Sequence, residues 1–498
     1  MKTDTKDMTT GSPARLLLAF SMPLMLGNLF QQLYTFADAV IVGQCVSANA
    51  LAALGATEWL TFIMFGVISG ITQGCSVVIA GFFGKKQMNE LKRAICSGLL
   101  IAVLGAAGFT LIGQIVLTPV LRLLRTPPEV FDLTREYLRI LYAGVPVTFL
   151  YNITAAVLRA LGNSKKPLHA MIIASLGNIA LDLLFVAEMD MGIAGAAYGT
   201  VLAQLLAAVY CGAALRRIRF QTGERLTEAG ADGQERYDTP ERPDMDYGLM
   251  GQETALADKR CCEESETGLS GRIGKLIDRQ ILREQIRMGI PMGVQNIITA
   301  AGGLVVQATV NGFGILFLTG YAAANKLYVL LEIAATSYGH GILTYTAQNK
   351  GIGSDKRIRE GLKSALIIGI ITALAMSAVM VFAGRPVLGL FIKETETGVE
   401  EMLRVGCNYL CVLAAGFPLL YCLYVVRACI QGMGDSVIPM LSSFMQVAMR
   451  IMCALFLTRL IGHTGVFWGE VAAWIGADIF LGIVCAGRLE KTTESVRL

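Results

Sequence analysis

Charged residues and histidine are scarce in this sequence, and each scarcity argues against a class of protein. Asp, Glu, Lys and Arg make up only 16% of the 498 residues, whereas a soluble globular protein has about 25%. The three histidines lie far apart in the chain, and no zinc-type ligand spacing, nucleophile elbow or phosphate-binding glycine loop is found. The sequence therefore disfavours an enzyme or a metalloprotein, and it has no nucleic-acid-binding signature.

Cysteine is not rare, but its placement argues against a disulfide framework. Most of the twelve cysteines fall inside apolar runs, where cysteine serves as a small packing residue. Cys261 and Cys262 are adjacent in a polar stretch, which is neither a zinc-binding nor a redox spacing. We therefore expect no cofactor and no metal, with the exception of a coupling ion considered below.

Long apolar runs dominate the chain. Hydrophobic residues make up 54% of it and the mean hydropathy is +0.57. Runs of spanning length recur with short polar breaks, which predicts an all-α polytopic membrane protein with about twelve transmembrane helices. The stretch before Pro13 is polar, so we expect no cleavable signal. The expected spans are 15–42, 51–82, 92–118, 132–160, 167–187, 193–215, 286–311, 320–348, 360–383, 401–429, 438–461 and 465–487.

Basic residues are unevenly distributed between the loops. They gather after the second, fourth, eighth and last expected spans, and the intervening loops are mostly neutral or acidic, with Arg122, Arg125, Arg135 and Arg385 as exceptions. By the positive-inside rule, this bias places the basic loops and both termini in the cytoplasm. We expect a monomer in the lipid bilayer of a prokaryotic plasma (inner) membrane.

The two halves of the chain repeat one another. Arg159-Ala-Leu-Gly-Asn-Ser164 matches Gln431-Gly-Met-Gly-Asp-Ser436, and Gly195-Ala-Ala-Tyr-Gly199 matches Gly465-Val-Phe-Trp-Gly469. Since six spans is an even number, both halves enter the membrane from the same side and are related by an axis along its normal. Transporters of this kind bind substrate between their halves. A duplicated channel is an alternative reading.

These patterns divide the chain into three parts. We expect an N-terminal six-helix lobe at 1–218, a polar cytoplasmic insert with a linker helix at 219–284, and a C-terminal six-helix lobe at 285–498. The insert is rich in Glu, Asp, Gly and Thr and lacks apolar periodicity, which is typical of a disordered linker. The amphipathic stretch 273–286 is expected to lie along the membrane surface. The insert is a passive connector or a regulatory segment.

Two acidic residues fall inside apolar runs, Asp38 in the first and Asp182 in the fifth. Ionisable residues at this depth are costly and usually face a cavity. Asn178 lies one helical turn before Asp182, so both side chains share a face. Two carboxyl groups in a low dielectric resist double ionisation, so the pair would take up a proton or a hard cation such as sodium. Local capping or pairing of each acid is the alternative.

Other polar residues suggest where a substrate binds. Glu332, in the eighth expected span, either attracts a cationic substrate or forms a structural pair. The seventh expected span carries Gln295 and Asn296. We treat these three residues as a candidate substrate cleft.

A family resemblance rests on several motifs together. Ser21-Met-Pro23 followed by Gln31-Gln-Leu-Tyr-Thr-Phe-Ala-Asp38 resembles the first helix of multidrug and toxic compound extrusion (MATE) transporters. Leu158-Arg-Ala-Leu-Gly-Asn163, with Asn178 and Asp182, resembles the fourth-to-fifth helix region of that family. Gly195 to Thr200 resembles its sixth helix, and Gln348-Asn349 a motif after its eighth. The similarity covers nearly the whole chain except the insert.

The resemblance implies a V-shaped pair of six-helix lobes that exports cationic or amphipathic small molecules by antiport with protons or sodium through alternating access. In the branch that this chain most resembles, the cation site lies in the N-terminal lobe. The matching positions are Asp38, Asn178, Asp182 and Thr200, supported by the lobe-lining residues Tyr137 and Asn152 and by Pro23, where the first helix is proposed to bend. Another branch uses acids on the seventh and tenth helices, and this chain has no mid-membrane acid on its tenth.

Two other functions stay open at this stage. A flippase for lipid-linked precursors of the same superfamily would need several basic residues in its central cleft to bind a pyrophosphate, and few are found at mid-membrane. A non-transporting membrane sensor or a membrane enzyme is the third reading, and no catalytic motif supports the latter.

Overall fold

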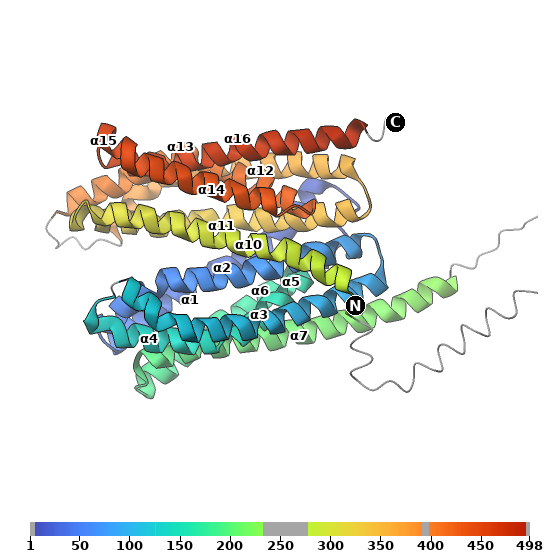
Figure 1. The fold of residues 1–498 in the computed structure, drawn as a ribbon, viewed down its shortest axis with the longest axis horizontal. Coiled ribbons are helices and arrows are strands. Elements are labelled where there is room, and N and C mark those ends of the chain that lie inside the picture. Colours follow the sequence, from blue (N-terminus) through green and yellow to red (C-terminus); the bar gives the residue numbers. More distant parts are fainter. Residues whose placement is uncertain (1–4, 125, 233–276, 391–397, 495–498) are drawn as a thin grey trace, which may run out of the picture.

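The computed structural model describes residues 5–124, 126–232, 277–390 and 398–494, and the regular elements of this described part are all helices, joined by short turns. Helices of the first half form one lobe and helices of the second half form another beside it (Figure 1). Both termini lie at the same end of the helical bundle, which we call the terminal end. The expected two-lobed, all-α membrane fold is confirmed.

The N-terminal lobe begins where Pro13 occupies the first turn of its first helix, a position that needs no backbone N–H donor. Its second helix is capped by Ser47, whose side chain accepts a hydrogen bond from the Ala50 backbone N–H. The helices are α1 (Pro13–Cys45), α2 (Ala48–Gly84), α3 (Met88–Leu123), α4 (Pro128–Ala143), α5 (Val145–Ala160), α6 (Lys165–Asp182), the π-helical turn η1 (Leu183–Glu188) and α7 (Gly192–Asp232).

The C-terminal lobe begins at a helix capped by Asp278, whose carboxylate accepts from the backbone N–H groups of Gln280 and Ile281. Its helices are α10 (Arg279–Asn311), α11 (Ile315–Gly351), α12 (Asp355–Gly389), α13 (Val399–Gly432), α14 (Val437–Met452), the π-helical turn η2 (Cys453–Leu457), α15 (Thr458–Ile461) and α16 (Thr464–Glu494). A π-helical turn follows α6 in one lobe and α14 in the other, so the two lobes share this feature.

Ten described helices are long and apolar enough to cross a bilayer, and the joined pair α4 and α5 makes an eleventh. The expected span at 132–160 falls on this pair, which is bent by 49° where Gly144 separates the two helices. A twelfth long helix, α11, occupies the expected place of 320–348, but it is more polar and carries Lys326, Glu332 and His340.

The boundaries between the lobes and the insert differ from expectation. Helix α7 continues past residue 218 to Asp232, so the first residues of the expected insert are helical. Of the amphipathic stretch 273–286, residues Arg279 to Ile286 are helical and form the first turns of α10, so they continue directly into the seventh expected span. Residues 233–276, which include most of the insert, lie outside the described part of the chain.

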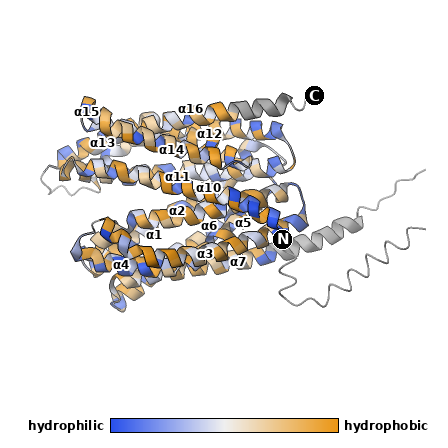
Figure 2. Ribbon diagram, viewed as in Figure 1, coloured by the Kyte–Doolittle hydropathy of each residue, from blue (hydrophilic) through white to orange (hydrophobic). Residues whose placement is uncertain are grey.

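Hydrophobic residues cover the middle of the helices and polar residues gather toward the two ends of the bundle (Figure 2). The outward faces of α3 and α12 carry large apolar side chains that are more than half exposed. Water would make such a surface unfavourable, whereas the hydrocarbon core of a bilayer covers it. Examples are Val103, Leu104, Leu111, Ile112, Ile115, Ile371 and Phe382.

The two lobes meet where α2 packs against α10 and α1 against α11. A Cβ atom added at Gly70 or Gly74 of α2 would meet the backbone around Gly289 and Gly293 of α10. The absence of side chains at these positions therefore lets the two helix backbones approach closely, as is common for helices packed in lipid. This glycine contact positions the N-terminal lobe against the C-terminal lobe.

The N-terminal segment closes the terminal end between the lobes. Met8 is fully buried, and its backbone N–H donates to Gln348 Oε1 at 2.9 Å. Its carbonyl accepts from Asn349 Nδ2 at 3.1 Å and from Arg357 at 3.3 Å. On the other side, the Lys6 backbone N–H donates to the carbonyl of Gly162 at 3.4 Å. The segment is thus bonded to both lobes at once.

Candidate functional site

The two membrane acids lie together in the N-terminal lobe. Asp38 of α1 and Asp182 of α6 are both buried, and their carboxyl groups are close enough to interact directly. Helices α1 and α6 pack against each other, which joins these two positions although they are far apart in the sequence. The expected juxtaposition of the two acids is therefore present in the structure.

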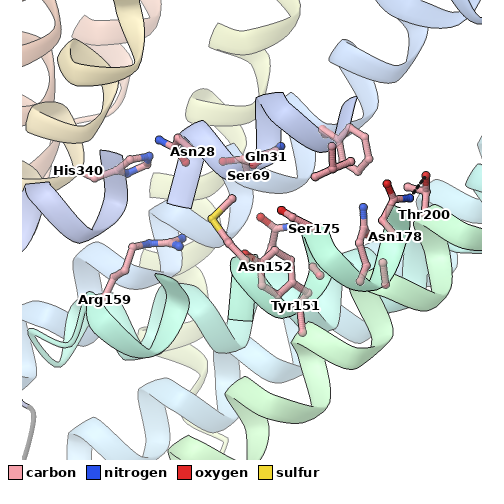
Figure 3. A pocket seen from close by; sticks show the side chains of 17 residues that line it. Asn28, Gln31, Ser69, Tyr151, Asn152, Arg159, Ser175, Asn178, Thr200 and His340 are labelled. Atoms are coloured by element: carbon pink, nitrogen blue, oxygen red, sulfur yellow. Dashed lines mark hydrogen bonds between the residues drawn. The ribbon is translucent and has the colours of Figure 1, made fainter. Parts of the chain in front are cut away.

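The oxygens of this pair are poorly supplied with hydrogen-bond donors. Among the described residues, Asp38 Oδ1, both Asp182 oxygens and Asn178 Oδ1 are buried without a donor. Asn178 Nδ2 donates to Thr200 Oγ1 at 3.4 Å, drawn as the dashed line in Figure 3. Buried carboxylate oxygens without a partner are costly, and a proton or a cation bound among them would remove that cost.

The local backbone brings α7 close to Asp182. Asp182 is the last residue of α6, just before the π-helical turn η1, and such turns are frequent at functional sites. A Cβ atom at Gly199 would collide with Asp182 Oδ1. Gly199 therefore gives the carboxylate its space and sets the next residue, Thr200, beside Asn178.

Two tyrosines border the acids. Tyr137 of α4, which the resemblance names as a supporting residue, lies close enough to interact electrostatically with both acids. Tyr34 of α1 also does so, and the sequence analysis missed it. The sequence spacing could have predicted this contact, because Tyr34 precedes Asp38 by one helical turn and therefore lies on the same face of the helix.

The other two supporting residues lie apart from the acids. Asn152 of α5 donates to the carbonyl of Thr148 at 2.9 Å and lines a nearby cavity. Pro23 lies within α1, which is one helix from Pro13 to Cys45. At 1.5 Å per residue, Pro23 is about 22 Å along the axis from Asp38. Any effect of Pro23 on the acids would pass through the helix rather than through contact.

A cavity of about 190 Å³ lies next to Asn178 and Thr200 (Figure 3). We call it the smaller cavity, and it is lined by helices of the N-terminal lobe and by His340 of α11. Asn178 and Thr200 lie at one end, and Arg159 and His340 lie at the other. Its polar lining also includes Asn28, Gln31, Tyr34, Ser69, Tyr151, Asn152, Ser175 and Gln204. Arg159 was not among the predicted site residues.

A larger cavity of about 480 Å³ lies between the lobes and includes Glu332. Tyr424 Oη donates to Glu332 Oε1 at 2.7 Å. Tyr328 stacks on Trp474 with 6.4 Å between the ring centroids, and both rings line the cavity. Glu332 is therefore a cavity residue surrounded by aromatic rings.

The other two residues of the expected substrate cleft have packing contacts. Gln295 Oε1 accepts a hydrogen bond from Gln431 Nε2 at 3.1 Å, and Asn296 Nδ2 donates to the carbonyl of Gly66 at 2.6 Å. Neither residue lines the larger cavity. The second contact joins α10 to α2, so Asn296 holds the lobes together.

The larger cavity also contains two arginines. Arg450 pairs with Glu470 at 2.6 Å. Arg427 donates to Ser442 Oγ at 3.3 Å and interacts electrostatically with Asp478. With these two cations engaged, Glu58 and Glu332 give the cavity an excess of negative charge.

Comparison with known proteins agrees with this architecture. A family model described as MatE matches residues 23–184 and 291–456, which together are well over half of the chain and fall in the two lobes. The chain belongs to the MatE family. The match to both repeats of this MatE protein leaves out the insert, as the sequence analysis expected.

The relatives of this MatE protein are similar over most of their length. It is 27% identical to the "Probable multidrug resistance protein YpnP" of Bacillus subtilis (strain 168) over 86% of this chain and 84% of that one. It is 22% identical to the "Multidrug export protein MepA" of Staphylococcus aureus (strain NCTC 8325 / PS 47), with 92% and 90% covered. A solved structure, "Crystal structure of MATE in complex with MaL6", shares the fold with a TM-score of 0.80 at 19% identity, with 99% and 100% covered.

Proposed function

We propose that this MatE protein exports amphipathic organic cations in exchange for protons or sodium ions. The observation that carries the proposal is the group of buried oxygens at Asp38, Asn178 and Asp182 that no described donor satisfies. Relatives named as multidrug resistance and multidrug export proteins support the substrate class.

The coupling ion binds where these oxygens converge. A proton shared by Asp38 and Asp182 neutralises one carboxylate, and the pair then titrates as a unit. A sodium ion instead takes oxygen ligands from both carboxylates, the Asn178 carbonyl and the Thr200 hydroxyl. In either case, binding removes the repulsion between two buried negative charges.

The organic cation binds in the larger cavity. Glu332 supplies a carboxylate, and the rings of Tyr328, Tyr424 and Trp474 supply the aromatic faces. A positive charge held over such faces is attracted by about 0.5–2 kcal/mol per ring, more when water is excluded. Glu58, which has no ion-pair partner among the described residues, adds a second negative charge at the same cavity.

Transport then alternates the side on which the cavities open. In this structure, the segment around Met8 bonds Gln348, Asn349 and Gly162, so the lobes are closed at the terminal end. The basic loops assign that end to the cytoplasm. Separation of the lobes there must break these bonds before substrate can enter.

The driving force available for export depends on the charge of the substrate. One charge crossing 100 mV gains about 2.3 kcal/mol. At about 1.36 kcal/mol per tenfold, one proton exchanged for a neutral substrate sustains a gradient of roughly 50-fold. A monovalent cation exchanged for one proton gains nothing from the voltage and must use the pH difference or a second proton.

The test uses purified protein in liposomes loaded with a fluorescent organic cation. A pH gradient and then a sodium gradient are imposed on the wild type, on Asp38→Asn and on a control, Asp132→Asn. Asp132 pairs with Arg135 at 2.9 Å on the exposed side of α4. We expect gradient-driven release by the wild type and the control but not by Asp38→Asn, and the effective gradient identifies the ion.

Two results would contradict the proposal. Normal release by Asp38→Asn would remove this residue from the coupling site. No gradient-dependent release by the wild type would count against antiport, and a lipid-scrambling assay on the same liposomes would then test the flippase reading.

A further inference from the structure

Arg159 places an unpaired positive charge in the smaller cavity. It lies in the last turn of α5, and its side chain extends into the cavity toward Asn28 and His340 (Figure 3). Within the described part of the chain, its guanidinium has neither a hydrogen-bond acceptor nor a carboxylate partner. A guanidinium that lines a confined cavity usually has a partner, because its desolvation is expensive.

The groups around Arg159 do not balance its charge. The nearby lining consists of neutral polar side chains such as Asn28, Ser69 and Asn152. His340 faces it from α11, and its Nδ1 lies 3.4 Å from Gln73 Nε2. Asp38 and Asp182 do not line this cavity. This end of the cavity is therefore positive, whereas the larger cavity is negative.

The sequence repeat indicates that the fold does not need this charge. The residue that matches Arg159 in the C-terminal lobe is Gln431, at the same step before the matching Gly-Asp-Ser turn. Gln431 is buried and neutral, and its amide donates to Gln295 Oε1 at 3.1 Å. A neutral amide satisfies this position in one lobe, so the guanidinium in the other has a different role.

The two cavities are neighbours, since Asn28 and Gln31 line both. The smaller one, at about 190 Å³, is below the roughly 300–1,000 Å³ that holds a drug-sized ligand. A substrate in the larger cavity can extend one group past Asn28 and Gln31 into the smaller one. The group that fits there carries negative charge.

We propose that Arg159 binds the carboxylate of substrates that carry both a cationic and an anionic group, while their cationic part lies near Glu332. This inference rests on the proposed function and names a substrate class for the same clefts. Arginine suits the role because its planar guanidinium binds a carboxylate through two parallel hydrogen bonds. Lysine would keep the charge but lose that geometry.

The test uses two dyes that differ by one ester. Rhodamine 110 carries a free carboxyl group, and rhodamine 123 is its methyl ester. Equilibrium binding of both is measured by fluorescence anisotropy on the full-length protein, as wild type, Arg159→Gln, Arg159→Lys and the control Lys326→Gln. Lys326 is an exposed cation of α11. Thermal unfolding of each variant reports whether it is folded.

We expect Arg159→Gln to weaken rhodamine 110 binding by about tenfold or more, as loss of a charge-assisted hydrogen bond predicts, and to leave rhodamine 123 within about twofold. The rhodamine 110 affinity of Arg159→Lys should lie between those of the wild type and Arg159→Gln. Lys326→Gln should bind both dyes as the wild type does. Equal weakening of both dyes, or no change in either, would overturn the proposal. Displacement of rhodamine 110 by phosphatidylglycerol at equal concentration would show that Arg159 binds a lipid headgroup and not a substrate carboxylate. That result would also overturn the proposal.

Failure of this inference and failure of the proposed function give different results. Dye binding needs no ion gradient, so it tests Arg159 independently of coupling. Gradient-driven release of rhodamine 123 from liposomes tests coupling and does not involve a carboxylate. Intact rhodamine 123 transport with an unchanged rhodamine 110 affinity in Arg159→Gln would reject only the role of Arg159.

Discussion

Arg450 and Glu470 form an ion pair in the C-terminal lobe at the positions that Asn178 and Thr200 occupy in the N-terminal lobe. The repeat matches Arg159 to Gln431 and Gly199 to Gly469, and the same alignments bring Arg450 to Asn178 and Glu470 to Thr200. In the C-terminal lobe, Arg450 Nη2 lies 2.6 Å from Glu470 Oε2, and both side chains are largely buried. In the N-terminal lobe, Asn178 Nδ2 donates a hydrogen bond to Thr200 Oγ1 at 3.4 Å.

This correspondence explains why the lobes differ in their need for a cation. In the C-terminal lobe, the guanidinium of Arg450 supplies positive charge from the chain itself. In the N-terminal lobe, the matching Asn178 is neutral and lies beside two acids whose oxygens lack donors. The lobe that has no fixed cation at this position is therefore the one proposed to bind a mobile cation there.

The first prediction concerns the ion pair. Glu470→Gln should lower the free energy of unfolding by about 3 kcal/mol or more, because it leaves the Arg450 charge without its partner. The double variant Arg450→Met, Glu470→Gln should recover much of that loss. The measurement is thermal unfolding of the detergent-purified protein.

A surface pair gives the matched control for this comparison. Arg385 and Glu400 are also bonded, at 2.9 Å, but both side chains are exposed. Glu400→Gln should therefore change the stability by less than about 1 kcal/mol. A double variant as unstable as Glu470→Gln alone would show that the loss is not due to an uncompensated charge.

The second prediction concerns the space beside Asp182. Gly199→Ala should weaken coupling-ion binding and slow transport by about tenfold or more, because the new methyl group occupies the place of Asp182 Oδ1. Gly212→Ala on the same helix meets nothing within 4 Å, so it should transport normally. The rate of gradient-driven dye release compares them. Equal rates for both variants would mean that Asp182 does not have to stay where this structure places it.

The third prediction concerns the glycine contact between the lobes. Gly74→Ala should lower the free energy of unfolding by about 1–3 kcal/mol, because the added Cβ atom meets the α10 backbone at Gly289. Gly55→Ala, also on α2, has open space around it and should be neutral or stabilising through helix propensity. Thermal unfolding of both variants tests this. If Gly74→Ala is as stable as Gly55→Ala, then α2 and α10 can move apart without lowering the free energy of unfolding.

The fourth prediction concerns the N-terminal segment. Met8→Asp should open the terminal end, because it places a charge where the side chain is fully buried. Spin labels at Lys165 and Lys356, both exposed, report the distance between the lobes in a cysteine-free background. We expect a longer and broader distance distribution than in the wild type.

The control for this experiment is Thr10→Asp, since Thr10 is exposed two residues further along the segment. It should leave the distance distribution unchanged. If Met8→Asp also leaves it unchanged, the bonds of Met8 to Gln348 and Asn349 do not hold the lobes closed.

The sequence by itself determined the helices and the positions of the acids along them. Apolar runs of spanning length and a two-fold repeat are local patterns, and they require no knowledge of which helices are neighbours. Asn178 and Asp182 could be assigned to one face for the same reason, since helical periodicity fixes it. The bend at Gly144 has a local cause that the prediction overlooked, because Pro146, in the first turn of α5, has no backbone N–H to continue the hydrogen bonding of α4.

Only the tertiary structure decided which polar side chains meet. Gln295 and Asn296 have the chemistry of a substrate cleft, but their amides form the contacts that join helices. Arg159 and Gln431 occupy matched positions, yet one faces a cavity and the other a partner. Hydrogen bonds and ion pairs across helices depend on distances of a few tenths of an ångström, and the packing of helices distant in sequence sets those distances.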